Sequence, residues 1–297
     1  MPTRWFLASF LVVFSLGCLA QDKPATRAAA NPQEIQNVNP LGTPVGPDYS
    51  KMSADELEGL GDEARGRKDF LTAIDCFQAA LSKSTTPATI YNKIGMTYLG
   101  MNQWQKAKVP LQKALKIDKK YPEAHNNLGV AIYLKAIEDA RLARASGKSS
   151  DPKDSQPRLG GAVKEYRKAI ELSPESASFH SNLGTAYFQQ KDYDRGLAEY
   201  REAFRLDPTV FERSATTGVQ AQMSGPGDRA RYYFTLARLH ASTGNFDKAL
   251  QSLRRALEDG FGDVKEIYKA PEFAKLVKDD RFTDLMKQRP TAIPSQN

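Results

Sequence analysis

Apolar residues recur along this chain with a helical spacing, in pairs of short stretches. The first pair consists of Leu57, Leu60, Gly61 and Ala64, followed by Ala73, Phe77 and Ala80. The spacing i, i+3, i+4, i+7 in the first stretch and i, i+4, i+7 in the second places each set on one face of an α-helix. Because both sets contain small residues, the two helix backbones can approach closely. The pattern predicts a hairpin of two amphipathic helices.

The hairpin pattern recurs with a period of thirty-four residues. The second copy consists of Tyr91, Ile94, Gly95 and Tyr98, followed by Ala107, Leu111 and Ala114. The third consists of His125, Leu128, Gly129 and Ile132, followed by Ala162, Tyr166 and Ala169. The fourth consists of His180, Leu183, Gly184 and Tyr187, followed by Gly196, Tyr200 and Ala203, and the fifth of Tyr233, Leu236, Ala237 and His240, followed by Ala249, Leu253 and Ala256. A regular period of this length indicates stacked helical repeats.

Two stretches interrupt the period. The second helix of the third copy arrives about twenty-one residues late, which indicates an insertion at about residues 138–160. The helix-favouring composition of residues 135–145 predicts that they prolong the first helix by two or three turns, and the Gly, Ser and Pro residues of 146–161 predict a loop. After Pro208 we expect a short helix near residues 210–223 and a break at residues 225–227.

These copies resemble tetratricopeptide repeats, a family whose pattern has Leu-Gly and Tyr in the first helix and Ala, Phe or Tyr, Ala and Pro in the second. The resemblance covers residues 54–260 and departs from the pattern at the insertion, at Ala237 where Gly is usual and at Gly196 where Ala is usual. It implies an all-α solenoid, a right-handed superhelix of about five hairpins. We expect a helical cap after the last hairpin, whose exposed face needs cover from Phe273, Leu276, Val277, Phe282 and Leu285.

The chain before the repeats has a different composition. Arg4 precedes an apolar stretch over residues 5–16, and residues 1–20 are typical of a secretory signal peptide. Cleavage after Ala20 is favoured; the alternative is lipid attachment at Cys18, in a run that resembles a bacterial lipobox with Ser15 where Leu is usual. Residues 21–52 are rich in Pro and predict a flexible tether. We therefore expect an exported protein, periplasmic or secreted.

The predicted organisation has five parts. They are a signal peptide at 1–20, a tether at 21–52, repeats 1–4 at 53–210, a connecting segment with repeat 5 at 211–259, and a cap and tail at 260–297.

In this family the first helices line a concave groove that holds peptides or partner helices. By alignment the partner-binding groove comprises Asn92, Met96, Asn126, Asn127, Val130, Tyr133, Ser178, Asn182, Thr185, Phe188 and Arg238. Amides suit the backbone of an extended peptide, and aromatic groups can seat apolar side chains. Alternatively, Asn127 and Asn182 hydrogen-bond within their own hairpins. The resemblance implies a non-enzymatic scaffold or adaptor, which the predicted export places in the bacterial cell envelope.

The charge is unevenly placed in a chain of 297 residues with a net charge of +7 and 40% hydrophobic residues. Six lysines lie in and after the second helix of the second repeat: Lys106, Lys108, Lys113, Lys116, Lys119 and Lys120. They form either a solvated outer face or a basic convex surface for anionic lipid or cell-wall polymer. No aromatic residues interleave with them, so a nucleic-acid partner is not expected.

Catalysis has little support in the sequence. With two cysteines and three histidines, neither a disulfide framework nor a dense metal site is expected. His125, His180 and His240 fall on repeat framework positions, which favours hydrogen-bonded core histidines, and Cys76 is interpreted as an inert, buried small residue. No zinc-protease, phosphate-loop or serine-hydrolase motif occurs. We expect no enzymatic activity, no cofactor and no small-molecule substrate, but a protein or peptide partner.

Overall fold

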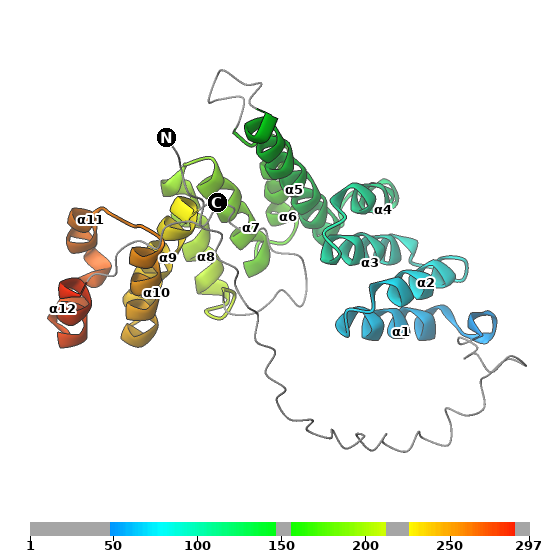
Figure 1. The fold of residues 1–297 in the computed structure, drawn as a ribbon. Coiled ribbons are helices and arrows are strands. Elements are labelled where there is room, and N and C mark those ends of the chain that lie inside the picture. The colour runs from blue at the N-terminus through cyan, green and yellow to red at the C-terminus, as the bar shows by residue number, and fades with distance from the viewer. Residues whose placement is uncertain (1–47, 147–155, 212–225, 289–297) are drawn as a thin grey trace, which may run out of the picture. The chain divides into compact units, whose positions relative to one another are not determined.

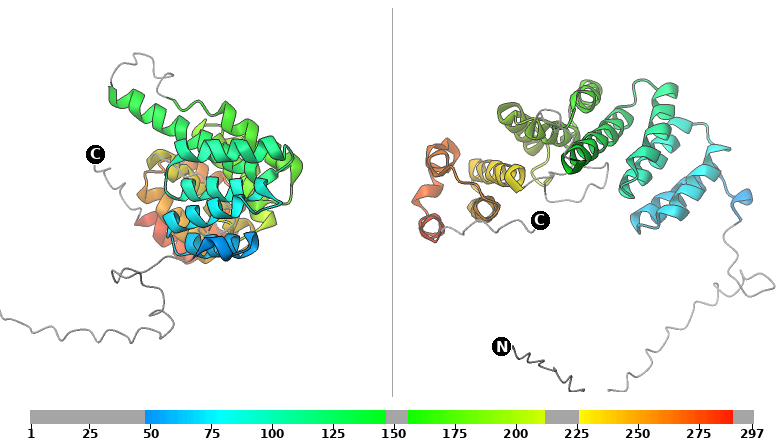
Figure 2. Two further views of the ribbon diagram at one scale, coloured as in Figure 1. Left: turned by 90° about the vertical axis from the view of Figure 1, so that its right-hand side faces the viewer. Right: turned by 45° about the horizontal axis from the view of Figure 1, so that its top comes forward.

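Paired α-helices make up the fold of this protein. The structure is a computed structural model that describes residues 48–146, 156–211 and 226–288. The first three pairs are α1 (Ala54–Gly66) with α2 (Phe70–Leu81), α3 (Pro87–Gly100) with α4 (Trp104–Ile117), and α5 (Pro122–Ser146) with α6 (Gly160–Leu172). The last two are α7 (Ala177–Gln189) with α8 (Tyr193–Leu206), and α9 (Pro226–Ser242) with α10 (Phe246–Glu258). The two helices of each pair lie side by side (Figure 1 and Figure 2), and every regular element in the described ranges is helical. The predicted solenoid of helical hairpins is confirmed.

Side-chain caps lie at the starts of several helices, and a recurring turn joins the two helices of a hairpin. Ser53 forms a capping box with Glu56 at the start of α1, and Asp69, Asp192 and Asn245 cap the second helices of their hairpins. The turns inside four hairpins each need one residue in the left-handed region, with φ of 63° at Lys68, 57° at Asn102, 63° at Lys191 and 77° at Gly244. The same turn geometry therefore recurs in each of these hairpins, and glycine satisfies it without strain.

Glycine allows the close approach of the two helices in a hairpin. A Cβ atom on Gly129 would lie 2.6 Å from the Tyr166 ring, and one on Gly184 would lie 2.5 Å from the Tyr200 ring. The departure at Gly196 has the same cause, because a Cβ there would lie 2.4 Å from the ring of Phe188. The bulky aromatic side chain of one helix thus occupies the space that the missing side chain of its partner leaves.

The helical first part of the insertion and the C-terminal cap follow the sequence prediction. Helix α5 continues to Ser146 and extends beyond its partner α6 (Figure 1), so the predicted prolongation is confirmed. After the fifth hairpin come α11 (Val264–Lys269), η3 (Pro271–Phe273), η4 (Leu276–Lys278) and α12 (Asp280–Lys287). Phe273, Leu276, Phe282 and Leu285 are buried in one cluster with residues of α9 and α10, and Val277 packs against it. These residues cover the last hairpin as predicted.

Several predicted segments fall wholly or partly outside the described residues. They are the signal peptide with Cys18, the tether up to residue 47, the loop at 147–155 and most of the short helix near 210–223. The last residues of the predicted tether are described and are held in place, because Lys83 Nζ donates to the carbonyls of Tyr49, Ser50 and Met52 at 2.8, 2.9 and 2.6 Å. Among the described helices, none has the length and apolar character needed to cross a membrane.

Candidate interaction site along the first helices

Four asparagines on the first helices of three hairpins form one hydrogen-bonded chain, which we call the asparagine ladder. Asn182 on α7 donates to Asn126 on α5 at 2.9 Å, and Asn126 donates to Asn127 at 3.2 Å. Asn127 donates in turn to Asn92 on α3 at 2.9 Å, and Asn92 donates to the Tyr121 hydroxyl at 3.3 Å. All four asparagines are buried. The ladder therefore links three consecutive hairpins through their first helices.

The two adjacent asparagines of α5 make the ladder continuous. Neighbouring residues on a helix point in directions about 100° apart, so Asn126 can face α7 while Asn127 faces α3. Each side-chain amide of the ladder donates to the next member, from Asn182 at one end to Tyr121 at the other. In such an arrangement hydrogen bonds polarise and strengthen one another. Asn127 and Asn182 each donate to the preceding hairpin, and Asn127 also accepts from Asn126 of its own hairpin, so the asparagines are not confined to contacts within their own hairpins.

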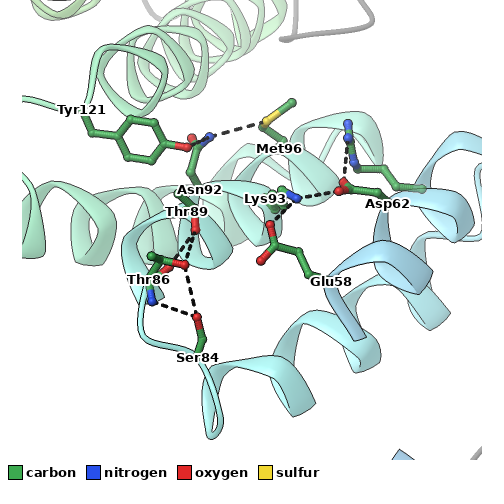
Figure 3. Close-up of polar contacts among 10 residues, drawn as sticks. Glu58, Asp62, Ser84, Thr86, Thr89, Asn92, Lys93, Met96 and Tyr121 are labelled. Atoms are coloured by element: carbon green, nitrogen blue, oxygen red, sulfur yellow. Dashed lines mark hydrogen bonds and ion pairs between the residues drawn. The ribbon is translucent and has the colours of Figure 1, made fainter. Parts of the chain in front are cut away.

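An ion-pair cluster continues the polar contacts from α3 to α1. Lys93 Nζ lies 2.5 Å from a carboxylate oxygen of Glu58 and 2.5 Å from one of Asp62 (Figure 3). Burial lowers the pKa of Lys93, but its hydrogen bonds to the two carboxylates outweigh that effect, so the pKa is raised. All three side chains remain partly exposed, and Asn92 and Met96 lie on the same helix as Lys93 (Figure 3).

Polar contacts also join the last hairpins and the cap. Lys191, after α7, pairs with Asp228 of α9 at 2.6 Å. Arg238 on α9 donates twice to Glu272 of η3 at 3.0 Å, and Arg201 donates to the same carboxylate at 2.6 Å. Burial raises the pKa of Glu272, but the arginine contacts outweigh it and the pKa is lowered. Arg238, a predicted groove residue, is therefore engaged by the cap.

Most of the other predicted groove residues are buried against neighbouring helices. The buried set comprises Asn92, Asn126, Asn127, Val130, Tyr133, Asn182, Thr185 and Phe188, whereas Met96, Ser178 and Arg238 are partly exposed. Val130 and Tyr133 belong to a core cluster, and burial raises the pKa of Tyr133. Phe188 stacks on Tyr200 with ring centroids 4.9 Å apart. The assignment of these residues to partner contact stays a prediction.

The sequence analysis missed four partly exposed groups beside the ladder, namely Glu58, Asp62, Lys93 and Tyr121. Glu58 and Asp62 lie thirty-four residues before Asn92 and Met96, so they occupy the same repeat positions in the first hairpin. Tyr121 directly precedes α5, outside the repeat pattern, and it ends the ladder by accepting from Asn92. The repeat register could have found the two carboxylates, whereas Tyr121 required the tertiary structure.

Two histidines make the same pair of contacts in successive hairpins. His125 Nδ1 lies 2.7 Å from Glu165 and its Nε2 3.1 Å from the Lys119 carbonyl, while His180 Nδ1 lies 2.7 Å from Glu199 and its Nε2 3.1 Å from the Pro174 carbonyl. Both ring nitrogens of His180 face acceptors, so a proton on each nitrogen would satisfy both of its contacts. Burial lowers the pKa of His180, but these two hydrogen bonds outweigh it and the pKa is raised. The prediction of hydrogen-bonded histidines is confirmed for this pair.

The remaining residues singled out from the sequence are His240, Cys76 and the six lysines of the basic surface. His240 is buried, with its ring edge-on to Phe204 at 5.3 Å between centroids. Cys76 is a buried free thiol that donates to the Tyr49 hydroxyl at 3.5 Å, a contact that helps raise the pKa of Tyr49 to about 12. The six predicted lysines of the basic surface are all exposed. Within the described ranges no group of three side chains is placed to hold a metal ion.

Five helical hairpins that stack on one another in the described part of the chain make this a helical repeat protein. Comparison with protein families identifies the type of repeat. A "TPR repeat" model matches residues 98–135 and 155–191, and two "Tetratricopeptide repeat" models match residues 177–210 and 230–258. The matched residues therefore carry tetratricopeptide repeats.

Curated relatives share these repeats. The chain is 27% identical over 166 residues to Hsp70-Hsp90 organizing protein 1 of Glycine max, covering 52% of this chain and 28% of that protein. It is 29% identical over 154 residues to the type IV pilus assembly protein PilF of Pseudomonas aeruginosa, covering 50% of this chain and 52% of that protein. The chain thus spans about half or less of the length of these relatives.

Two solved structures align with more than two thirds of this chain. MamA is 20% identical with a TM-score of 0.40, over 69% of this chain and 97% of that one. A thermophilic TPR protein of Thermus thermophilus is 19% identical with a TM-score of 0.47, over 76% of this chain and 100% of that one.

Proposed function

We propose that this protein is a non-enzymatic scaffold of the bacterial cell envelope that binds a peptide or partner helix along the first helices of its repeats. Tetratricopeptide repeats are protein-interaction modules, and the two curated relatives described above are called an organizing protein and an assembly protein. The place in the envelope rests on the signal-peptide pattern of residues 1–20. The partner is a protein segment rather than a small molecule.

One observation carries the binding mode: partly exposed groups border the asparagine ladder at its α3 end. Lys93, Met96 and Tyr121 surround Asn92 (Figure 3). Met96 and Tyr121 offer an apolar side chain and a hydroxyl, whereas the ammonium group of Lys93 is held by Glu58 and Asp62. An extended peptide presents one N–H and one C=O per residue, which match such groups, and its side chains need apolar contact as well. We therefore place the partner along α1, α3 and the start of α5.

Site-specific photo-crosslinking of the full chain tests this placement. A photoreactive amino acid at position 96 should give a defined protein adduct in cells, identified by mass spectrometry. The matched control is position 71, since Leu71 is also apolar, is highly exposed and lies on the second helix of its hairpin. Equal adducts from both positions, or none from position 96, would contradict the proposal.

Affinity for the identified partner provides a second test. The variant Met96→Ala with Tyr121→Phe should weaken binding at least tenfold, while Leu71→Ala should leave it unchanged. Binding through uncharged groups should also respond weakly to salt. An unchanged affinity in the double variant would place the partner elsewhere on the chain.

A further inference from the structure

Helix α4 carries a second stripe, which is exposed and flanks its core face. The buried face consists of Ala107, Pro110, Leu111 and Ala114. The exposed stripe consists of Lys106, Val109, Lys113, Lys116, Ile117 and, in the turn that follows, Lys120. These positions follow the spacing of three and four residues that keeps side chains on one helix face. We call this set the outer stripe.

Positive charge on the outer stripe is not neutralised by carboxylates. Helix α4 contains no acidic residue, and within the described ranges none of the stripe's lysines lies within ion-pair distance of one. The second helices α6 and α8 differ, since Lys168 pairs with Glu171 at 2.8 Å and Arg205 with Glu202 at 2.6 Å. Lys106 and Lys113 lie over the Tyr98 and Tyr91 rings of α3, 6.0 and 5.2 Å from the ring centroids, and the Lys120 backbone N–H donates to Asp118 at 2.8 Å. These contacts pair none of the ammonium groups with a carboxylate, so the charge of the stripe is available to an external anion.

Two large apolar side chains lie exposed among these lysines. Val109 is 57% exposed and Ile117 is 52% exposed. A soluble polyanion would gain little from them, because its binding depends on charge. An anionic bilayer offers phosphate groups for the lysines and an acyl boundary for the apolar side chains. Lysine suits this position because its long apolar stem can lie along the boundary while its ammonium group reaches the headgroups.

We propose that the outer stripe of α4 docks on the surface of a membrane that contains anionic phospholipid. A helix of 14 residues presents a contact line about 21 Å long, which can lie flat on a bilayer. The stripe lies on α4, whereas the proposed peptide site lies on α1, α3 and α5, so one surface can be occupied while the other binds. Membrane docking would thus place the scaffold at the bilayer.

Sedimentation of the full chain with lipid vesicles tests the proposal. The protein should bind vesicles of phosphatidylcholine mixed with phosphatidylglycerol, fail to bind pure phosphatidylcholine, and lose binding as salt is raised. The variant Lys113→Gln, Lys116→Gln, Lys120→Gln should reduce partitioning about a hundredfold, at about fivefold per lysine. The matched control Lys265→Gln, Lys269→Gln, Lys275→Gln removes the same charge from the cap and should change partitioning only a fewfold.

A second variant separates a membrane from a soluble polyanion. Val109→Gln with Ile117→Gln keeps every charge, and it should weaken vesicle binding about tenfold while leaving heparin binding unchanged. Equal losses in the α4 and cap lysine variants, or vesicle binding that is unaffected by the apolar variant, would overturn the proposal. Thermal unfolding followed by circular dichroism confirms that each variant is folded, as expected for exposed positions.

Discussion

Two equivalent tyrosines differ in one hydrogen bond. Tyr166 and Tyr200 pack their rings on Gly129 and Gly184, but only the Tyr200 hydroxyl reaches a partner, the Thr185 hydroxyl at 2.9 Å. The buried Tyr166 hydroxyl has no hydrogen-bond partner in the described part of the chain. Burial raises the pKa of both phenols. The aromatic repeat position therefore serves packing, and its hydroxyl is used in one hairpin only.

This difference predicts opposite outcomes for one chemical change. Tyr200→Phe should lower the free energy of unfolding by about 1 kcal/mol, because it breaks a buried hydrogen bond. Tyr166→Phe should leave the free energy unchanged or raise it, because it removes a buried polar group that has no partner. Urea unfolding of the two variants measures both values. Equal losses would show that the Tyr166 hydroxyl is bonded after all.

His180 predicts a pH dependence of stability. Its folded pKa is raised above the unperturbed value of 6.5, so the folded state holds the proton more tightly than the unfolded state. The resulting stability is fully present below pH 6.5 and is lost as the pH rises through the folded pKa. The unfolding free energies of the unmodified protein and of His180→Gln should therefore differ most at acidic pH and converge at alkaline pH.

Glu199→Gln provides the control for that titration. It removes the carboxylate that His180 contacts and leaves the contact with the Pro174 carbonyl in place. The pH-dependent part of the stability should shrink in this variant. An unchanged pH profile would mean that Glu199 does not hold the proton on the ring.

At the scale of the element, α1 contains two glycines with different surroundings. A Cβ on Gly61 would lie 2.5 Å from the Phe77 ring, whereas a Cβ on Gly59 would meet nothing within 4 Å. Gly61→Ala should therefore lower the free energy of unfolding by about 1–3 kcal/mol through overpacking. Gly59→Ala should raise it by up to about 1 kcal/mol through helix propensity. Thermal or urea unfolding checks the sign of each change.

Hairpin elements were predictable because their signals are local. The apolar spacing, the Leu-Gly positions and the caps all lie within one hairpin, and each acts through neighbours three or four residues away. The reason for Gly196 was not predictable in this way. It depends on the packing of Phe188 from the partner helix, which the repeat pattern does not specify.

At the scale of the whole molecule, the asparagine ladder predicts coupling between hairpins. Asn127→Ala would leave the side-chain Oδ1 of Asn92 without its donor and the side-chain Nδ2 of Asn126 without its acceptor. The free energy of unfolding should fall by about 2–4 kcal/mol, since each buried polar group that loses its partner costs about 1–3 kcal/mol. Stacked repeats are stabilised mainly by contacts with neighbouring hairpins. Because Asn127 links α5 to α3, its loss should weaken the attachment of the first two hairpins, and protection of backbone amides against hydrogen exchange should fall most in α1–α4.

A double-mutant cycle with Asn92→Ala checks the coupling. If the ladder acts as a connected network, the double variant should cost less than the sum of the two single variants. Strict additivity, or a loss of protection confined to α5, would show that the asparagines act independently.

The sequence by itself determined the repeat period, the hairpins, the prolonged α5 and the apolar residues of the cap. These features depend on side-chain spacing within one element or between neighbouring elements. It also assigned all four asparagines of the ladder to the surface that the first helices line.

Only the tertiary structure decided what those asparagines contact. Asn126 and Asn182 are 56 residues apart, with the insertion between them, and no local signal brings their amides to 2.9 Å. The same holds for Lys93 with Glu58, and for Arg238 with Glu272 of the cap. Apolar periodicity specifies which face of a helix is buried, but the pairing of buried polar groups depends on how neighbouring hairpins stack, because a hydrogen bond requires a distance and an angle that only the packed helices provide.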